Sequence, residues 1–259
     1  MIGGTEGCSR STKRYLLRRK KKKEKRKAEK LRKRVSSLRK ALQSVQEGNF
    51  VSRRVLKQLT RDKLRRGLEQ GVIICFDCSY ESLMSPKECG KFAQQFCRAY
   101  GANRSSATPA SLHLVSCSPG GPLLNACKAK CDGFERYTIV MHNTSALEAF
   151  GSEKDIVYLS PDAEQPLLSV DKSVVYVVGC LVDEHLLKGK SLAEATRHGC
   201  KALRLPLQEY AATRHMQVVN PVLAINQVVE VLLGYIQMAN NWEEVIHSAV
   251  PSRLFRAKS

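Results

Sequence analysis

The most constraining feature of the sequence is a short apolar run, Val174–Val178, which is followed by Gly179, Cys180 and the acidic residue Asp183. A β-branched run without polar alternation is typical of a strand that is buried on both faces, as in the centre of a parallel sheet. A glycine directly after such a strand lets the backbone turn or lets a ligand approach closely. Ligands of open parallel α/β sheets bind at the carboxyl ends of the strands, so an acidic residue there could meet a substrate. Taken alone, the run fits a core strand with a solvated acidic turn better than a functional site.

Other short apolar runs alternate with amphipathic segments through the rest of the chain. We predict strands at 72–76, 111–115, 137–141, 156–159, 174–178 and 200–205. We predict helices at 52–68, 86–100, 146–150, 191–198, 221–238 and 242–250. This alternation predicts an α/β fold, in which a parallel sheet is covered by helices on both faces.

Several of these helices have specific end signals. Ser85 followed by Pro86 is typical of a helix start, and Gly101 is expected to stop that helix. Ser191 and Glu194 have the spacing of a capping box, so Ser191 is the expected N-cap of the helix that follows.

The positive charge of the chain is concentrated near its N-terminus. The formal net charge is +19, and the segment from Arg10 to Lys40 contains 18 Lys/Arg and 2 Glu. Residues 41–70 contain 7 basic and 3 acidic residues, and the chain from residue 71 onward contains 18 of each. We therefore divide the chain into a basic, largely helical extension (1–70), a globular domain (71–250) and a short tail (251–259).

The extension from Ser11 to Gln46 is rich in helix-forming residues and contains no Pro or Gly, and Gly48 and Asn49 are expected to break it. A thin apolar stripe runs along its second half, at Leu31, Val35, Leu38, Leu42 and Val45. Three interpretations remain open: an RNA-binding arm, a nuclear-import signal and a solvated tail. Because the charge is of one sign, we favour RNA binding, with phosphate contacts along residues 10–70.

Cysteine usage and missing motifs narrow the functional classes. The ten cysteines are scattered, several of them within apolar runs, which favours reduced thiols and a location in the cytosol or nucleus. Cys75 and Cys78 form a lone Cys-x-x-Cys without a matching second pair, and the histidines have no metal-ligand spacing, so we expect no metal site. We find no secretory signal, no membrane-spanning run, no dinucleotide-binding glycine motif, no P-loop, no nucleophile elbow and no zinc-protease motif.

Four turn segments remain as candidates for chemistry, and together they resemble a known family. The segments are YLSPD (158–162), YVVGCLVD (176–183), ALRLPLQEY (202–210) and LAINQV (223–228), with NWEE (241–244) near the end. This ordered set resembles the tRNA purine-N1 methyltransferases that modify the ninth nucleotide, which belong to the SPOUT superfamily. The segment DCSYESLM (77–84) and the basic N-terminal helix are also similar to that family, so the resemblance covers roughly residues 10–250.

The resemblance implies a knotted fold and a cofactor. The expected fold is a parallel-sheet SPOUT methyltransferase domain with a C-terminal trefoil knot, and S-adenosylmethionine would be bound in the knot. Matched by motif, the expected pocket comprises Leu159, Gly179, Cys180, Leu181, Asp183, Ser191, Leu205, Pro206, Leu223, Ala224, Ile225 and Asn226. Asp183 matches the family's proposed general base for the purine N1 proton. The resemblance also implies tRNA as the partner and a monomeric protein, with guanine as the expected target and adenine as the alternative.

The sequence departs from the family pattern at two positions. The family usually has two glycines where this chain has Gly179 and Cys180, so the thiol is expected to narrow the pocket or to require a less strained turn. Glu81 stands where an aspartate is common. Two alternatives follow: an RNA-binding protein of this fold with weak or no methylation activity, and a methyltransferase of the same superfamily that acts on ribosomal RNA.

Overall fold

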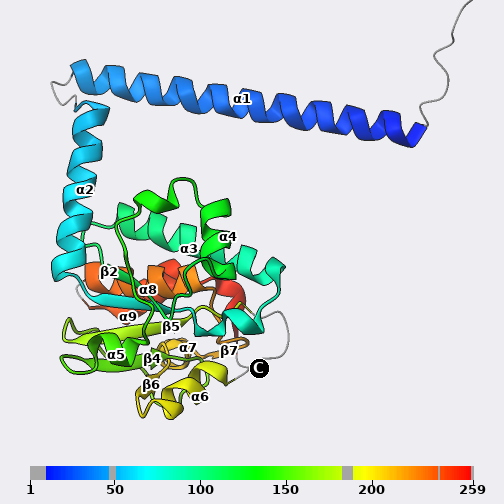
Figure 1. The fold of residues 1–259 in the computed structure, drawn as a ribbon. Helices are drawn as coiled ribbons and strands as arrows, with labels where there is room; N and C mark the ends of the chain where they lie inside the picture. Colours follow the sequence, from blue (N-terminus) through cyan, green and yellow to red (C-terminus); the bar gives the residue numbers. More distant parts are fainter. Residues whose placement is uncertain (1–9, 47–50, 183–188, 239, 258–259) are drawn as a thin grey trace, which may run out of the picture. The chain divides into compact units, whose positions relative to one another are not determined.

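The computed structural model describes residues 10–46, 51–182, 189–238 and 240–257. By its internal contacts the chain divides into two units, Met1–Lys57 and Gln58–Ser259. The first unit contains helix α1 (Arg10–Gln46) and the start of helix α2 (Arg53–Gln70) (Figure 1). The division lies nearer the N-terminus than the boundary at residue 70 that the charge suggested. The expected break at Gly48 and Asn49 lies outside the described residues.

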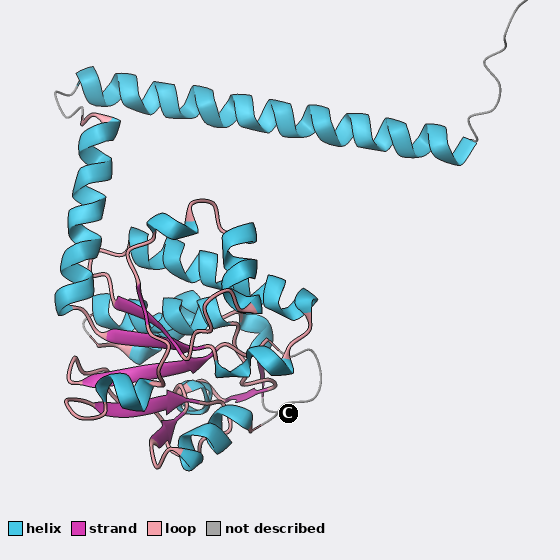
Figure 2. Cartoon of the chain, in the orientation of Figure 1, coloured by secondary structure: helices cyan, strands magenta, loops and turns pink. Residues whose placement is uncertain are grey.

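A six-stranded sheet in the order β3-β2-β1-β5-β4-β6 organises the second unit, and every pairing in it is parallel (Figure 2). The strands are β1 (Ile73–Asp77), β2 (Ser111–Val115), β3 (Val140–Met141), β4 (Asp155–Leu159), β5 (Val174–Gly179) and β6 (Lys201–Leu203). Strand β5 contains the apolar run with which the sequence analysis began, and it lies between β1 and β4. The predicted parallel α/β architecture is therefore confirmed.

Both faces of the sheet are covered, which explains why β5 lacks polar residues. Tyr176 and Val178 pack on one face, in a cluster with residues of α3, α4 and α8. Val175 and Val177 pack on the other face, with Ala146 of α5 and Ala195 of α6. These helices are α3 (Pro86–Ser105), α4 (Pro122–Lys130), α5 (Ala146–Phe150), α6 (Lys190–Arg197) and α8 (Ile225–Gln237).

A smaller cluster lies at the C-terminal end of the unit and involves the segment expected to be a tail. Strand β7 (Met216–Val218) pairs in antiparallel fashion with β8 (Phe255–Ala257), and Leu254, which directly precedes β8, is buried. The cluster also contains helices α7 (Leu207–Thr213) and α9 (Trp242–Ala249). The short 3-10 turns are η1 (Ser79–Leu83), η2 (Phe134–Arg136) and η3 (Ser252–Leu254). The segment that the sequence analysis set apart as a short tail (251–259) contains η3 and β8, so as far as Ala257 it completes a β-ribbon.

Two predicted helix ends in the first half of the second unit had different outcomes. Ser85 caps α3 as expected, with Glu88 completing a capping box. Gly101 does not stop α3, which continues to Ser105. A glycine inside a helix costs only about 1 kcal/mol relative to alanine. The packing of α3 on α4 and α8 outweighs that cost, and Asn103 fixes the true end by two hydrogen bonds with the backbone of Ala110.

Two other helix starts were wrong. Helix α6 begins at Lys190 after Gly189, which has a left-handed backbone (φ 75°), so Ser191 is not its N-cap and makes no capping box. Helix α8 begins at Ile225 rather than at Pro221. The side chain of Gln95 accepts a hydrogen bond from the Ile225 N–H (2.9 Å), so a residue far away in the sequence fixes this start.

None of the helices in the described part of the chain combines the length and apolar character that crossing a lipid bilayer requires. The trefoil knot stays a prediction, since the path between Val182 and Gly189 lies outside the described residues.

Candidate functional site

The carboxyl ends of four neighbouring strands bring the predicted turn segments to one edge of the sheet. Leu159 at the end of β4 pairs with Val178 of β5 and with Leu203 of β6. Gly179 at the end of β5 pairs with Asp77 at the end of β1. The segments that follow these strands therefore begin side by side, as expected for ligand-binding turns of a parallel sheet.

The predicted pocket residues differ in how deeply they are buried. Leu159, Cys180, Pro206, Ile225 and Asn226 are buried, whereas Gly179, Leu181, Ser191, Leu205, Leu223 and Ala224 are partly buried. Leu159, Cys180 and Ile225 belong to one apolar cluster, and Leu205 packs against it. The structure thus brings the turns after β4, β5 and β6 together with the start of α8. Asp183, the predicted base, lies outside the described residues.

Gly179 is closely surrounded, so a side chain there would press on its neighbours. A Cβ atom at this position would lie 2.9 Å from Ser191 Oγ and 3.2 Å from Tyr80 Cε2. The residues with a left-handed backbone among those described do not include Gly179, so crowding rather than backbone conformation accounts for the glycine. Ser191, although it is not a helix cap, therefore packs at the turn that the sequence analysis placed at the cofactor.

Cys180 points into the core. Its side chain is fully buried, and its Sγ lies 3.9 Å from Sγ of Cys78, which in turn accepts a hydrogen bond from the Cys117 thiol (3.4 Å). Its backbone N–H donates to the carbonyl of Asp77 (2.8 Å). Burial raises the pKa of the Cys180 thiol to about 11, so the thiol stays protonated near neutral pH. Cys180 also lacks a left-handed backbone, so the turn does not require the second glycine that is usual in the family.

Asn226 offers an unsatisfied polar atom near these turns. Its side chain donates to Glu230 (3.1 Å), but its Oδ1 atom is buried and has no hydrogen-bond partner within the described structure. A buried acceptor without a donor costs about 1–3 kcal/mol unless a ligand or water supplies the donor. An amino or hydroxyl group of an adenosine-bearing molecule is a suitable donor. The orphaned oxygen of Asn226 therefore fits the expected S-adenosylmethionine.

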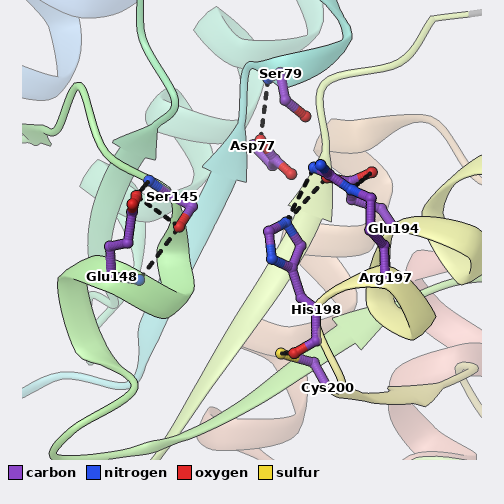
Figure 3. Close-up of polar contacts among 8 residues, drawn as sticks. All are labelled: Asp77, Ser79, Ser145, Glu148, Glu194, Arg197, His198 and Cys200. Atoms are coloured by element: carbon purple, nitrogen blue, oxygen red, sulfur yellow. Dashed lines mark hydrogen bonds and ion pairs between the residues drawn. The ribbon is translucent and has the colours of Figure 1, made fainter.

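The sequence analysis overlooked a buried carboxyl group at the same edge, that of Asp77 (Figure 3). Only 2% of Asp77 is exposed, and its Oδ1 accepts a hydrogen bond from the Ser79 N–H (3.0 Å). Burial raises the pKa of Asp77, against the opposing effect of the hydrogen bonds from Ser79 and Ser116. The sequence did contain a signal for this group. Asp77 directly follows the predicted buried strand 72–76, and an acidic side chain in that place is either exposed to solvent or part of a functional site.

Helix α6 contributes a second carboxyl group near Asp77, that of Glu194 (Figure 3). Burial opposes ionisation of Glu194, but hydrogen bonds from Arg197 and His198 outweigh it and lower the Glu194 pKa. The N–H of Gly189 donates to Asp162 Oδ2 (2.9 Å), so the YLSPD turn fixes the start of α6. Figure 3 also shows Ser145 and Glu148, which form the capping box of α5 and have a purely structural role.

Metal chemistry has no support in the described residues, where no group of three or more His, Cys, Asp or Glu side chains is arranged to hold an ion. The three thiols of Cys78, Cys117 and Cys180 are packed as buried hydrophobic side chains.

Comparison with protein families places the chain in one of them. The model described as tRNA (guanine(9)-N(1))-methyltransferase TRM10/TRM10A matches residues 6–255. Mouse tRNA methyltransferase 10 homolog B is 36% identical over 225 residues, which are 85% of this chain and 70% of that protein. Fission yeast tRNA (guanine(9)-N1)-methyltransferase is 29% identical over 77% of this chain and 64% of its own length. The chain spans between 63% and 73% of the length of the vertebrate homolog B proteins that it matches.

Solved structures agree with the sequence comparison. The crystal structure of full-length spTrm10 in complex with SAH has a TM-score of 0.61 and 27% identity, and the match covers 70% of this chain and 95% of that chain. Trm10 from Thermococcus kodakaraensis has a TM-score of 0.50 at 17% identity, which supports the fold alone. From the family match and the shared SPOUT methyltransferase fold, we conclude that this chain belongs to the tRNA (guanine(9)-N(1))-methyltransferase family TRM10/TRM10A.

Proposed function

We propose that this protein transfers a methyl group from S-adenosylmethionine to N1 of the purine at the ninth position of tRNA, with guanine as the target. The observation that carries the proposal is the family match, which spans residues 6–255 and so includes all four turn segments at the sheet edge. Two observations support it. The fission yeast relative is named for this reaction, and spTrm10, which has the same fold, was crystallised with S-adenosylhomocysteine, abbreviated SAH.

In the proposed site the chain holds the cofactor with backbone groups of the turns and with Asn226. Bound S-adenosylmethionine would supply an electrophilic methyl group on its sulfonium. The turns after β4, β5 and β6 would hold that methyl in line with guanine N1, and positioning of this kind lowers the barrier strongly. The orphaned Asn226 Oδ1 is the group of this chain best suited to contact the cofactor.

The proton on guanine N1 must leave as the N1–methyl bond forms and the sulfonium–methyl bond breaks. Asp183 is our proposed acceptor, directly or through water. Val182 is the last described residue before Asp183. Its backbone nitrogen lies 3.4 Å from Met84 Sδ, so the turn after β5 packs, as far as Val182, against the residue that follows η1. Adenine N1 carries no proton, so methylation of adenine would depend less on Asp183.

The basic extension would supply most of the affinity for tRNA. Eighteen Lys/Arg lie between Arg10 and Lys40, and such a segment binds phosphates through counterion release rather than through base recognition. The ninth nucleotide would have to be unstacked to reach the site. We further propose that the protein is a monomer, located in the nucleus, the cytoplasm or both.

The binding-only alternative was motivated by Cys180, and the structure weakens that motive. The Cys180 thiol is fully buried beside Cys78 rather than exposed at the turn. The alternative nevertheless predicts a distinct result. A ligand that binds only the native state raises Tm, so a binding-only protein would show no thermal shift with saturating S-adenosylmethionine.

The proposed function is tested by methylation of tRNA transcripts that carry G, A or C at the ninth position. We expect transfer of the methyl group to G9 transcripts and none to C9 transcripts, with a reverse-transcription stop at nucleotide nine. Methylation of A9 alone would overturn the choice of guanine. A product on ribosomal RNA with none on tRNA would favour the second alternative, and this is checked by primer extension on total RNA from cells that lack the protein.

The role of Asp183 is tested by Asp183→Asn, with the neighbouring Glu184→Gln as the matched control. Loss of a general base typically reduces the rate by about 10²–10⁴-fold. We expect a loss in this range in single-turnover methylation of a G9 transcript, while the thermal shift with S-adenosylmethionine is kept. Full activity of Asp183→Asn across pH would exclude the base role, and an equal loss in Glu184→Gln would point to disturbance of the turn.

A further inference from the structure

The second half of α1 has an apolar seam that phosphate binding does not explain. Leu31, Val35 and Leu38 are 62%, 49% and 53% exposed, although all lie within a continuous helix (Figure 1). In the sequence, the steps of four and three residues continue to Leu42 and Val45. At about 100° per residue, these five positions span only about 80° of the helix circumference. A stripe this narrow, with a strict a/d period, is typical of a coiled-coil seam rather than of a helix that packs broadly on a core.

The residues that flank the seam determine which partner can cover it. If Val35 is an a position and Leu38 a d position, the flanking e and g positions hold four basic residues, Lys27, Arg32, Arg34 and Arg39, and one small apolar residue, Ala41. All four basic residues are exposed. In coiled coils the e and g residues face those of the partner helix and select it by charge.

A second copy of this chain is a poor partner for the seam. In a parallel pair, Arg34 of one copy would face Arg39 of the other, and in an antiparallel pair each flanking position would face its own kind. Like charges across such an interface are destabilising and act as specificity determinants against self-association. The charge pattern therefore disfavours a homodimer formed through the seam.

RNA is a poor occupant of the seam for a different reason. Phosphate groups are bound by cations, and helix α1 carries its densest cations upstream, from Arg18 to Lys27. The apolar side chains of Leu31, Val35 and Leu38 add nothing to such binding and expose apolar surface to water. The helix thus has two parts, a cationic first half and a seam with cationic edges.

We propose that the seam of α1, residues 28–45, binds an acidic amphipathic helix of another protein, with apolar residues at its a and d positions and Glu or Asp at e and g. The apolar residues supply burial, and the acidic edges pair with Lys27, Arg32, Arg34 and Arg39. The seam is only about 27 Å long at 1.5 Å per residue, so the complex is a short, reversible one. This surface is distinct from the methyl-transfer site and does not depend on the proposed function.

The test uses the full chain and a designed four-heptad peptide with Val at a, Leu at d and Glu at e and g. A second peptide has the same composition and charge but scrambled a and d residues. Binding is measured by fluorescence anisotropy at about 150 mM salt, where the Debye length is about 8 Å and long-range attraction is largely screened. We expect the patterned peptide to bind at least about tenfold more tightly than the scrambled one, because only the former buries apolar surface.

Variants of the chain locate the binding on the seam. The triple substitution Leu31→Gln/Val35→Gln/Leu38→Gln keeps good helix formers and the charge, and should weaken binding of the patterned peptide at least about tenfold. The control Ser36→Gln/Ser37→Gln changes other faces of the same helix and should leave binding unchanged. Circular dichroism of each variant verifies that helix content is kept.

Three outcomes would overturn the proposal. Equal binding of the patterned and scrambled peptides, or of the wild type and the triple variant, would mean that only charge is recognised. Sedimentation showing a dimer that the triple variant abolishes would assign the seam to a second copy. Protection of Val35→Cys from a thiol reagent in the monomeric, peptide-free chain, in a background where Cys8 is replaced by serine, would mean that the protein covers the seam itself.

Discussion

Helix α1 and strand β5 show two different ways in which a sequence determines the role of a segment. In β5 each residue is fixed by its neighbours: Val175 and Val177 are fully buried on one face, and a side chain at Gly179 would press on Ser191 and Tyr80. In α1 the residues from Arg14 to Arg39 are all exposed. The role of this helix is therefore determined by the distribution of its charges and the spacing of its apolar residues. Substitutions in β5 should therefore act through packing, whereas substitutions in α1 should act through binding alone.

The largest expected effect comes from removing the extension. Deletion of residues 1–50 should lower tRNA affinity by about 10²–10³-fold at moderate salt, because a protein with several phosphate contacts gains that much from counterion release. The slope of log affinity against log salt should flatten in parallel. The thermal shift with S-adenosylmethionine should persist, since the sheet and its turns lie in the separate unit Gln58–Ser259. If the salt slope is unchanged after the deletion, the phosphate contacts lie in the globular unit, and α1 does not have the binding role that distinguishes it from β5.

The next effect is expected at Gly179, where Gly179→Ala should be destabilising although it adds one methyl group. The new Cβ would lie within 3.2 Å of the Tyr80 ring and 2.9 Å of Ser191 Oγ, and overpacking of this kind costs about 1–3 kcal/mol. Urea unfolding and titration with S-adenosylmethionine measure the two consequences. Gly101→Ala is the matched control, because nothing lies within 4 Å of its Cβ and a helix interior favours alanine by about 0.5–1 kcal/mol.

Removing the crowding atom identifies the cause. The double variant Gly179→Ala/Ser191→Ala should recover part of the stability lost in Gly179→Ala, since it deletes the hydroxyl that the new methyl meets. If the double variant is no more stable than the single one, the crowding by Ser191 is not responsible.

Much of the sheet could be predicted because its determinants are local. Runs such as Val174–Val178 are apolar because both faces are covered, and this shows in the sequence without knowledge of the covering helices. Local patterns indicated four turn segments as candidates for chemistry, and the family resemblance then assigned them an expected cofactor and base. The start of α8 could not be predicted in this way, since it depends on Gln95, more than one hundred residues earlier in the chain.

Contacts between residues that are distant in sequence also explain the other features that the sequence analysis predicted wrongly or missed. Ser191 and Glu194 have capping-box spacing, but Gly189 adopts a left-handed backbone whose N–H bonds to Asp162, so the helix starts one residue earlier and Glu194 bonds instead to Arg197 and His198. Strand β8 pairs with β7 across a long separation in sequence, and neither has a strong strand pattern. The contacts of Cys78 with Cys180 and with Cys117 depend on the order of three strands in the sheet, which the sequence alone did not reveal.

A moderate effect of pH on the free energy of unfolding is expected from the histidine pair His113 and His142. His113 bonds to Ser111 Oγ (2.9 Å) and His142 Nε2 (3.0 Å), and burial together with the charge of His142 lowers its pKa to about 4. The ordinary pKa of histidine is 6.5, so His113 is protonated below about pH 6.5 in the unfolded chain. In the folded chain it is protonated only below about pH 4. This stability is present above pH 6.5 and is lost as the pH falls, by about 3 kcal/mol in total.

The measurement is urea unfolding between pH 7.5 and 4, at constant ionic strength. His113→Gln should be less stable at neutral pH, because buried hydrogen bonds are lost, but its stability should change less between pH 6.5 and 4. His215→Asn is the control, since His215 is exposed and asparagine tolerates its left-handed backbone. If the wild type and His113→Gln show parallel pH profiles, another group accounts for the acid sensitivity.

The smallest effect is expected at Cys180, where restoring the glycine that is usual in the family separates packing from catalysis. The Cys180 thiol contacts the core and its backbone does not need glycine, so Cys180→Gly should lower the free energy of unfolding by about 1–2 kcal/mol through a lost buried side chain and added chain entropy. Affinity for S-adenosylmethionine, measured by calorimetry, should change less than about twofold, a difference smaller than RT. Cys200→Ala, at a half-buried thiol on the opposite face of the sheet, controls for the loss of a sulfur atom. A tenfold gain in cofactor affinity for Cys180→Gly would show that the thiol obstructs the pocket, and β5 would then resemble α1 in being tuned for binding as well as for packing.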